Sequence, residues 1–219
     1  LTVTPASDYN GTLEVTVTAS DGQASGSGTL TLEVMPVNDA PVISDLEDQV
    51  IDEDTSLTFD INGSDVDGDA LTFSATNGDS DISVDGTTLT IIPPANYNGS
   101  EVVTVIVSDG QLETSAAFTL TVSPVNDAPS VDDVAGTTAE DTDFVLELNG
   151  TDIDGDALTF LASADAGSAS VNGSTLTVTP AADYNGDITV NITVSDGQAS
   201  GSGTLTLTVT PVNDAPMIG

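Results

Sequence analysis

The chain has 219 residues, of which 36 are Asp or Glu and none is Lys, Arg, His or Cys, so its formal net charge at pH 7 is −36. This composition excludes side-chain salt bridges, a histidine general base, lysine or arginine chemistry, disulfides and cysteine metal sites. It also leaves no cationic side chain that could bind nucleic-acid phosphates. Leu, Ile, Val and Phe still make up about a quarter of the chain, above the roughly 20% below which sequences tend to be disordered. The sequence therefore favours a folded, acidic protein that needs a cation from solution.

Internal repetition organises the whole chain. The string PVNDAP begins at Pro36, Pro124 and Pro211, so it recurs after 88 and then 87 residues. The strings EDT, DGDALTF, YNG and SDG keep the same period, which indicates tandem domains. We therefore expect the last part of repeat one (residues 1–37), two complete repeats named here repeat two (38–125) and repeat three (126–212), and a linker that starts a further repeat (213–219).

The partial repeat at the start has a consequence for the rest of the protein. Half a repeat cannot cover its own core, so the missing half is expected either upstream in a longer chain or from another molecule. The chain opens inside a strand pattern, LTVTP, without a signal peptide, which also favours a piece of a longer protein. No apolar run approaches the roughly 18 residues of a membrane span, so no membrane insertion is expected here.

Each complete repeat is predicted to be all-β. Alternating apolar residues bounded by Gly, Asn, Asp and Pro predict strands in repeat two. In chain order these strands lie near residues 41–44, 56–62, 70–75, 82–84, 88–92, 101–108 and 114–123. The dipeptide Asp85-Gly86 is typical of a tight hairpin turn, and Asp109-Gly110 of the turn before the last strand. Seven short strands in a repeat of this length favour an immunoglobulin-like sandwich.

The carboxylates gather at turns and repeat junctions instead of spreading evenly. Three of them fall within five residues at Asp65, Asp67 and Asp69, and again at Asp152, Asp154 and Asp156. Such a cluster is costly unless a cation neutralises it, and hard oxygen ligands in a flexible loop favour calcium. An EF-hand is excluded because, with Asp65 at position one, Ala70 stands where the loop needs glycine.

Strand directions place some of these groups together. The strand near 101–108 runs opposite to the last strand, so Asn96 and Asn98 are expected at the end of repeat two where the linker Asn126-Asp127 begins. The same parity puts Asp109 at the far end of the repeat. We interpret Asp109 and its counterpart Asp196 as hairpin-turn residues.

The order of Glu, DxD, SDG and VNDAP motifs resembles the cadherin repeat. PVNDAP together with DxDGDALTF is most similar to the bacterial cadherin-like repeats of large secreted adhesins and surface proteins. The resemblance covers the whole chain and implies tandem immunoglobulin/cadherin-like β-sandwiches in an extended rod. It also implies Ca²⁺ ions between successive domains, so that each repeat has its neighbouring repeats and calcium as partners.

The resemblance implies one ligand set for each junction. Between repeats one and two the set is Asp8, Asn10, Asn38, Asp39, Asp65 and Asp67. Between repeats two and three it is Glu53, Asn96, Asn98, Asn126, Asp127, Asp152 and Asp154. After repeat three it is Glu140, Asp183, Asn185, Asn213 and Asp214. Asp69 and Asp156 are further candidates, with capping of the turn as the alternative. The alternatives for the rest are polar turns, a β-turn between prolines, and an exposed strand edge.

The chain departs from the animal cadherin pattern in two ways that bear on function. Proline stands where an aspartate usually opens the linker motif, and Asn98 stands where glutamate is typical, so fewer ions or weaker sites are expected. The chain has no tryptophan, so strand exchange of the animal cadherin kind is not carried over.

The preferred functional prediction is a calcium-rigidified spacer of an extracellular bacterial adhesin or surface fibre, secreted to the cell surface. One alternative is a self-assembling filament in which other copies complete the partial repeat. Another is a module that binds a glycan or a protein. Catalysis is not expected, because the carboxylate pairs recur with the structural period in every repeat.

Overall fold

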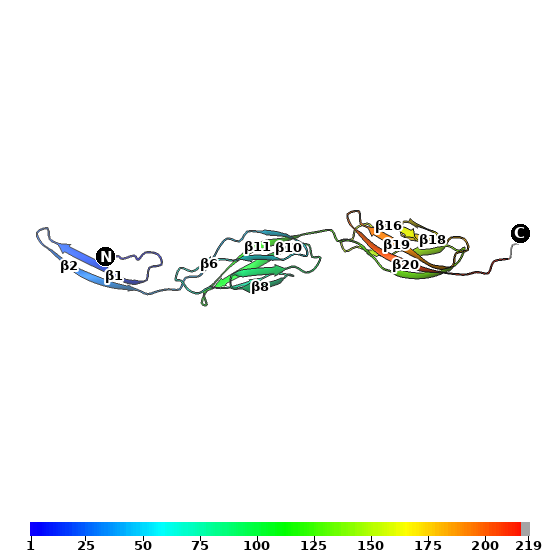
Figure 1. Cartoon of the computed structure of the whole chain (residues 1–219). Helices are drawn as coiled ribbons and strands as arrows, with labels where there is room; N and C mark the ends of the chain where they lie inside the picture. The colour runs from blue at the N-terminus through cyan, green and yellow to red at the C-terminus, as the bar shows by residue number, and fades with distance from the viewer. Residues whose placement is uncertain (216–219) are drawn as a thin grey trace. The chain divides into compact units, whose positions relative to one another are not determined.

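The computed structural model describes residues 1–215, and every regular element among them is a β-strand (Figure 1). The chain divides into two compact units, Leu1–Pro124 and Val125–Gly219, and each is considered by itself. The first unit holds the partial repeat and repeat two, and the second holds repeat three. The predicted start of a further repeat falls on residues 213–219, of which 216–219 lie outside the described residues.

The partial repeat forms a single hairpin. Strands β1 (Gly11–Ser20) and β2 (Ser25–Val34) pair antiparallel from Gly11 opposite Val34 to Ser20 opposite Ser25. The turn is made by Asp21, whose Oδ1 accepts the backbone N–H groups of Gln23 at 2.9 Å and Ala24 at 2.8 Å. These hydrogen bonds, with the Ala24 contact the largest cause, hold the pKa of Asp21 below its usual value. The hairpin is a two-stranded sheet with no third strand paired to it among the described residues.

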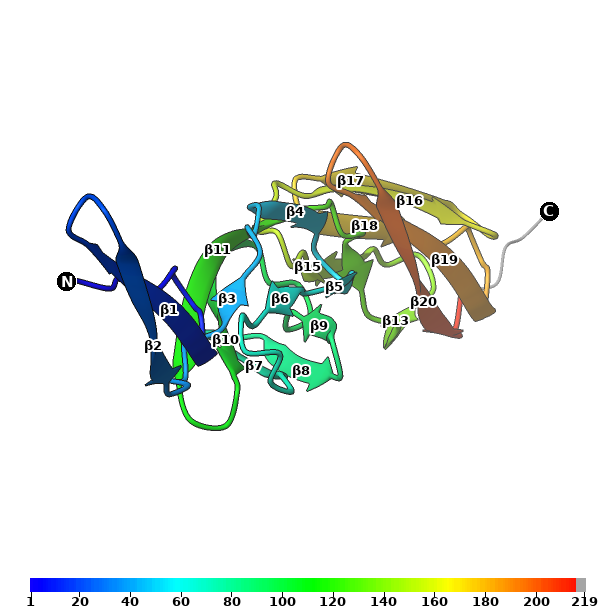
Figure 2. The ribbon, with the colours of Figure 1, turned by 90° about the vertical axis from the view of Figure 1, so that its left-hand side faces the viewer.

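Repeat two is a sandwich of short strands (Figure 2). One sheet has the order β4-β11-β10-β7, in which β4 runs parallel to β11, and the other has the order β5-β9-β8. A two-stranded ladder joins β3 to β6. The strands are β3 (Val42–Ile43), β4 (Gln49–Asp52), β5 (Leu57–Asp60), β6 (Gly63–Ser64), β7 (Thr72–Thr76), β8 (Asp81–Asp85), β9 (Thr88–Ile92), β10 (Gly99–Ser108) and β11 (Glu113–Ser123).

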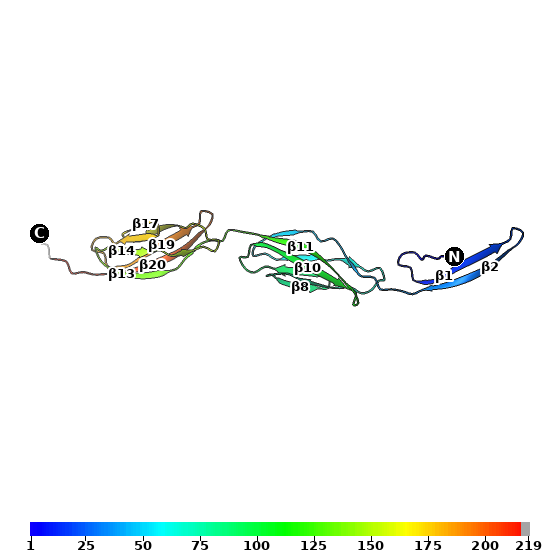
Figure 3. The same cartoon turned by 180° about the vertical axis from the view of Figure 1, so that it is seen from behind.

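Repeat three has the same topology (Figure 3). Its sheets have the orders β13-β20-β19-β16 and β14-β18-β17, with β12 paired to β15. The strands are β12 (Ser130–Val131), β13 (Val134–Ala139), β14 (Phe144–Glu147), β15 (Gly150–Thr151), β16 (Thr159–Ala164), β17 (Ser168–Asn172), β18 (Thr175–Thr179), β19 (Gly186–Ser195) and β20 (Ser200–Thr210).

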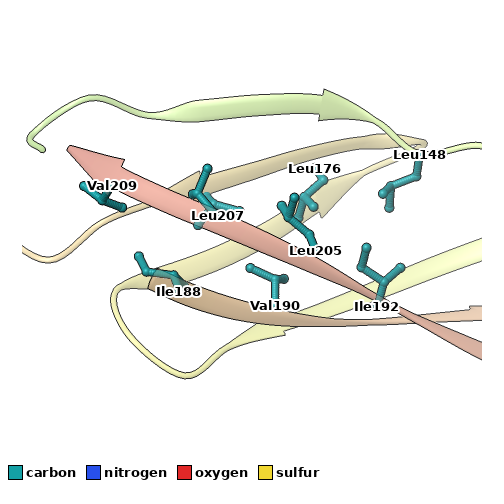
Figure 4. Close-up of a cluster of buried hydrophobic side chains, with 9 residues drawn as sticks. Leu148, Leu176, Ile188, Val190, Ile192, Leu205, Leu207 and Val209 are labelled. Carbon is teal, nitrogen blue, oxygen red and sulfur yellow. The ribbon is translucent and has the colours of Figure 1, made fainter. Parts of the chain in front are cut away.

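The core of each repeat follows from the two-residue period of its strands. In β19 and β20 the inward-facing Ile, Val and Leu side chains alternate with polar residues and are 0–2% exposed (Figure 4). They meet Leu148 and Leu176 from the opposite side of the sandwich. Each such side chain contributes about 1.5–3 kcal/mol when fully buried. Repeat two has an equivalent cluster around Leu89, Val105 and Leu120.

The predicted all-β sandwich is confirmed, with differences in detail. The strand predicted near 56–62 is shorter, as β5, and that near 70–75 begins later, as β7. Two strands were not predicted, the short β6 and the parallel strand β4. Strand β4 is half polar and pairs with β11, which lies far along the sequence, so no local pattern indicates it.

Candidate metal centre

The DxD loop of repeat two follows strand β6 and is shaped by its first aspartate. Asp65 Oδ1 accepts the backbone N–H groups of Asp67 at 2.9 Å and Asp69 at 3.2 Å. Gly68 has a φ of 82°, which a side chain would disfavour. The second oxygen of the same carboxylate, Asp65 Oδ2, is buried and has no hydrogen-bond partner. The loop therefore presents a desolvated anionic oxygen.

The DxD loop of repeat three is built in the same way. Asp152 Oδ1 accepts the backbone N–H of Asp156 at 3.1 Å, and Asp152 Oδ2 is buried without a hydrogen-bond partner. Gly155 has a φ of 79°, close to that of its counterpart in repeat two. In both loops the backbone N–H of the third aspartate donates to the side chain of the first aspartate. The turn is therefore capped by the carboxylate of the first aspartate.

The middle aspartate of each loop holds the linker that enters the same repeat. Asp67 Oδ2 accepts the backbone N–H of Asp39 at 2.9 Å, and Asp154 Oδ2 accepts that of Asp127 at 2.8 Å. The predicted linker and DxD residues are thus brought together within each unit. A proline follows each linker after one alanine, and both prolines are buried, which helps to fix the entry of the chain.

The linker asparagines lie against the SDGQ hairpin of the repeat that follows them. Asn38 Nδ2 donates to Asp109 Oδ2 at 2.8 Å, and Gln111 Nε2 donates to Asn38 Oδ1 at 3.0 Å. Asp109 Oδ1 meanwhile accepts the backbone N–H groups of Gln111 and Leu112, at 2.6 and 2.7 Å. Repeat three has the same network around Asn126, with distances of 2.9 Å to Asp196 and 2.7 Å from Gln198.

These hydrogen bonds keep the two hairpin aspartates ionised. The backbone N–H of Leu112, followed by the Asn38 amide, lowers the pKa of Asp109 below its usual value. For Asp196 the Asn126 amide is the largest cause of a lowered pKa, followed by the backbone N–H of Ala199. Their predicted role as turn residues is confirmed, but their second oxygen also binds the linker. The recurrence of SDGQ one period apart was the signal for this second role.

Two clefts in the unit Leu1–Pro124 are lined by five of the six residues predicted for the first junction, all except Asp65. A cleft of about 350 Å³ is lined by Asp8, Asn10, Asp39 and Asp67 among others. A second cleft, of about 450 Å³, is lined by Asn10, Asn38, Asp67, Asp69 and Gln111 among others. Asn10 and Asp67 line both clefts, so the two clefts adjoin at these side chains.

The end of repeat three gathers a further predicted set. Glu140 is 5% exposed, and its Oε1 accepts the backbone N–H of Val212 at 2.5 Å. Asp183 and Asp214 have carboxylate oxygens within 4.8 Å of each other and of Asp141, which was not predicted. Asn185 and Asn213 are exposed, and Asn213 Nδ2 donates to the backbone oxygen of Asp214 at 3.3 Å.

The corresponding end of repeat two joins three more predicted residues. Glu53 is 4% exposed, and Asn98 Nδ2 donates to its Oε2 at 3.3 Å. Asp54 Oδ1 accepts the backbone N–H of Asn96 at 3.0 Å. Asp54 was missed, like its counterpart Asp141. Asp54 and Asn96 have φ values of 59° and 55°, a conformation that Asp and Asn tolerate better than most residues. The expected approach of Asn98 to Asn126-Asp127 involves both units and stays a prediction.

The donor set fits a hard divalent cation. It consists of carboxylate and amide oxygens, and the chain has no cationic side chain that could neutralise them. A buried carboxylate oxygen without a partner carries its full desolvation cost, of roughly 1–3 kcal/mol or more for a charged group. Asp65 Oδ2 and Asp152 Oδ2 are in this state at the same position of two repeats. A cation at each loop would remove that cost.

Comparisons with known proteins agree with this topology. Residues 125–210 match the family described as cadherin-like domain, and residues 38–123 match the family described as bacterial Ig domain. Human protocadherin-24 EC1-2 aligns with a TM-score of 0.53 and 14% identity, over 80% of this chain and 100% of that one. Drosophila N-cadherin EC1-4 aligns with a TM-score of 0.51 and 18% identity, over 94% of this chain and 58% of that one. The resemblance to bacterial cadherin-like repeats is thereby confirmed.

An endo-fucoidan hydrolase of glycoside hydrolase family 107 also aligns, with a TM-score of 0.36 and 22% identity over 96% of this chain. The chain spans 35% of that enzyme's length, and so low a TM-score supports no inference about catalysis. No curated protein sequence matches the chain. Cadherin-like and bacterial Ig domains are typically non-enzymatic and typical of surface or extracellular proteins. In the described part of the chain, no helix has the length and apolar character needed to cross a membrane.

Proposed function

We propose that these repeats are calcium-rigidified spacers of an extracellular bacterial adhesin or surface fibre. The observation that carries this proposal is the buried, unpartnered oxygen of Asp65, repeated at Asp152, in a chain without any cationic side chain. Cadherin-like and bacterial Ig domains suggest a repeat module of surface proteins. The role as a calcium-rigidified spacer follows because the clustered carboxylates require a cation that neutralises them.

Calcium would act by ordering the linker. Asp67 and Asp154 already hold the backbone of their linkers, and Asp109 and Asp196 hold the linker asparagines. Without a cation these carboxylates repel one another, which favours an open linker. A calcium ion supplies the positive charge that lets the same groups stay close, and the linker then becomes stiff.

The expected calcium affinity predicts where the linkers become stiff. Extracellular calcium modules bind with Kd of about 10⁻⁴–10⁻³ M, so such sites fill outside cells and remain empty at cytosolic calcium levels. A chain of this type is flexible during export and stiffens in calcium-bearing medium. This behaviour suits a spacer that holds another part of the protein away from the cell surface.

Calcium titration of the full chain, followed by calorimetry and by NMR of the loop amides, tests the proposal. Asp65→Asn should weaken calcium binding at repeat two by about tenfold or more, because ligand charge sets the affinity of such sites. Without calcium the same variant should be at least as stable as the parent chain, since it removes a buried, unpartnered charge.

Asp85→Asn is the matched control, because it removes the same charge at an exposed hairpin turn where repeat three carries Asn172. Equal calcium affinities for Asp65→Asn, Asp85→Asn and the parent chain would show that the DxD loop is not a calcium site. Small-angle scattering in millimolar calcium and in excess chelator then tests the spacer role itself. Identical profiles in the two conditions would contradict rigidification.

A further inference from the structure

Asn-Gly pairs recur along the chain, and this pair has a chemistry of its own. The backbone nitrogen of the glycine can attack the side-chain carbonyl carbon of the asparagine, because glycine has no Cβ to obstruct the approach. The attack needs an exposed pair, a glycine N–H without a partner, and a backbone with room to turn. The pairs begin at Asn10, Asn62, Asn77, Asn98, Asn149, Asn172 and Asn185.

In five of these pairs the glycine is the first residue of a strand. Gly63 and Gly150 begin β6 and β15, and a Cβ at either would lie 2.9 Å from a neighbouring atom. The other three glycines begin β1, β10 and β19, and a Cβ on each would lie 3.1–3.6 Å from a tyrosine hydroxyl oxygen. Ring closure at these pairs therefore requires local opening of the strand end.

The pair at Asn77 is held by its side chain. Asn77 is half-buried, and its Nδ2 donates to Oε2 of Glu101 at 3.3 Å. Glu101 is itself only 7% exposed. Conversion of this amide to a carboxylate would place two negative charges together in a buried site, which is unfavourable.

The pair Asn172-Gly173 meets all three requirements. It lies at the turn between β17 and β18, both residues are exposed, and a Cβ at Gly173 would meet nothing within 4 Å. In the described part of the chain no hydrogen bond holds the Asn172 side chain or the Gly173 N–H.

The other half of the same turn is fixed. The Ser174 hydroxyl donates to Glu147 Oε2 at 3.0 Å, and the Ser174 backbone oxygen accepts the N–H of Leu148 at 2.8 Å. The Asn172 side chain can thus reorient toward Gly173 while these contacts keep the hairpin in place.

Repeat two shows that this turn accepts a carboxylate. It carries Asp85-Gly86 at the equivalent position, where Gly86 has a φ of 62° and Gly173 one of 65°. An acidic side chain lies across from the turn in both repeats, since Thr88 donates to Asp60 as Thr175 donates to Glu147. An aspartate in place of Asn172 would therefore reproduce the turn of repeat two.

We propose that Asn172 is a site of spontaneous deamidation. The Gly173 nitrogen forms a bond to Cγ of Asn172, and the side-chain nitrogen leaves as ammonia together with the proton from the Gly173 nitrogen. Water then opens the resulting five-membered imide at one of its two carbonyls, which gives aspartate or isoaspartate. The modification adds one negative charge to repeat three, and it is independent of calcium binding.

The two products have different effects on the hairpin. Aspartate keeps the backbone that repeat two already uses. Isoaspartate adds a backbone carbon next to the pair that Asn172 forms with Thr175, so the register between β17 and β18 cannot be kept there. Amides of β17 and β18 should exchange at least about tenfold faster in the isoaspartate form, and at the parent rate in Asn172→Asp.

Ageing of the full chain at neutral pH tests the proposal. Peptic peptides are analysed by mass spectrometry, because the chain has no Lys or Arg for trypsin, and an isoaspartyl methyltransferase detects isoaspartate. Asn172 should convert at least about tenfold faster than the other six asparagines, which must first open locally. In denaturant this preference should disappear, since all seven pairs share the same two residues.

Asp85→Asn provides the matched variant, because it creates an Asn-Gly pair in the equivalent turn of repeat two. Asn77 and Asn98 are the controls within that repeat. The new asparagine should convert at least about tenfold faster than either control.

Three results would overturn the proposal. One is conversion of another asparagine as fast as Asn172 in the folded chain. Another is an Asp85→Asn variant whose new pair reacts no faster than its two controls. The third is a preference for Asn172 that persists in denaturant, which would show that the fold does not select the site.

Discussion

Repeats two and three fill the same core position with opposite chemistry. Glu101 in β10 is 7% exposed, and the aligned residue in β19 is Ile188, which is 0% exposed. Glu101 Oε2 accepts the Asn77 amide at 3.3 Å and the backbone N–H groups of Asp79 at 3.3 Å and Ser80 at 3.4 Å, while Oε1 accepts the Ser80 hydroxyl. A buried carboxylate here fastens the loop between β7 and β8.

Repeat three closes the corresponding loop without a buried charge. Asp165 Oδ1 accepts the backbone N–H of Thr189 at 2.9 Å from an exposed position. Gly167, with a φ of 77°, lets the loop approach β18, where a Cβ would lie 2.2 Å from the backbone oxygen of Thr179. One topology therefore tolerates either a polar latch or an apolar core at this point, provided that the adjacent loop changes with it.

The largest effect is expected when the charge is moved to the repeat that lacks the latch. Ile188→Glu should destabilise repeat three by about 4 kcal/mol or more, because the carboxylate would be buried without hydrogen-bond donors. Denaturant unfolding followed by NMR signals of each repeat measures this loss, with repeat two as the internal control. Unchanged stability would mean that the loop of repeat three can rearrange into a latch.

The reverse exchange should cost less. Glu101→Ile in repeat two leaves the N–H groups of Asp79 and Ser80 without their acceptor but adds apolar packing, so a loss of about 1–3 kcal/mol is expected. Faster amide exchange in the loop between β7 and β8 should accompany it. If exchange there does not change, Glu101 does not hold this loop.

The smallest effect concerns the linker asparagines, and it is expected to differ between the two repeats. Asn126→Ala should raise the pKa of Asp196 more than Asn38→Ala raises that of Asp109, since the amide is the largest cause of the lowered pKa only in repeat three. Carboxyl NMR titration measures both shifts. Equal shifts would remove this distinction between the repeats.

The sign of the pH effect follows from the direction of these shifts. The folded-state pKa of each hairpin aspartate is lowered, so its contribution to stability is present above the unfolded value of about 3.9. That contribution is lost as the pH falls from there through the lower folded-state pKa. The asparagine variants should therefore lose less stability than the parent chain as the pH falls below about 3.9. Near neutral pH, the contact between linker and hairpin should contribute less to their stability.

The sequence predicted the repeats, the sandwich and the DxD loops because each leaves a local pattern. It did not predict the second role of Asp109 and Asp196, since an aspartate before glycine is already explained by its turn. Asp54 and Asp141 were missed for a related reason, because the glutamate beside each was assigned as the metal ligand. The parallel strand β4 could not be foreseen, because its partner β11 is distant in sequence.

The parallel pairing of each early strand with the last strand of its repeat has a mechanical consequence. Strand β4 has 4 residues against β11, and β13 has 6 residues against β20. When tension pulls an early strand and the last strand of a repeat apart along their length, the hydrogen bonds between parallel strands are loaded together in shear instead of one after another. Repeat two, with the shorter ladder, is therefore expected to unfold at a lower force than repeat three.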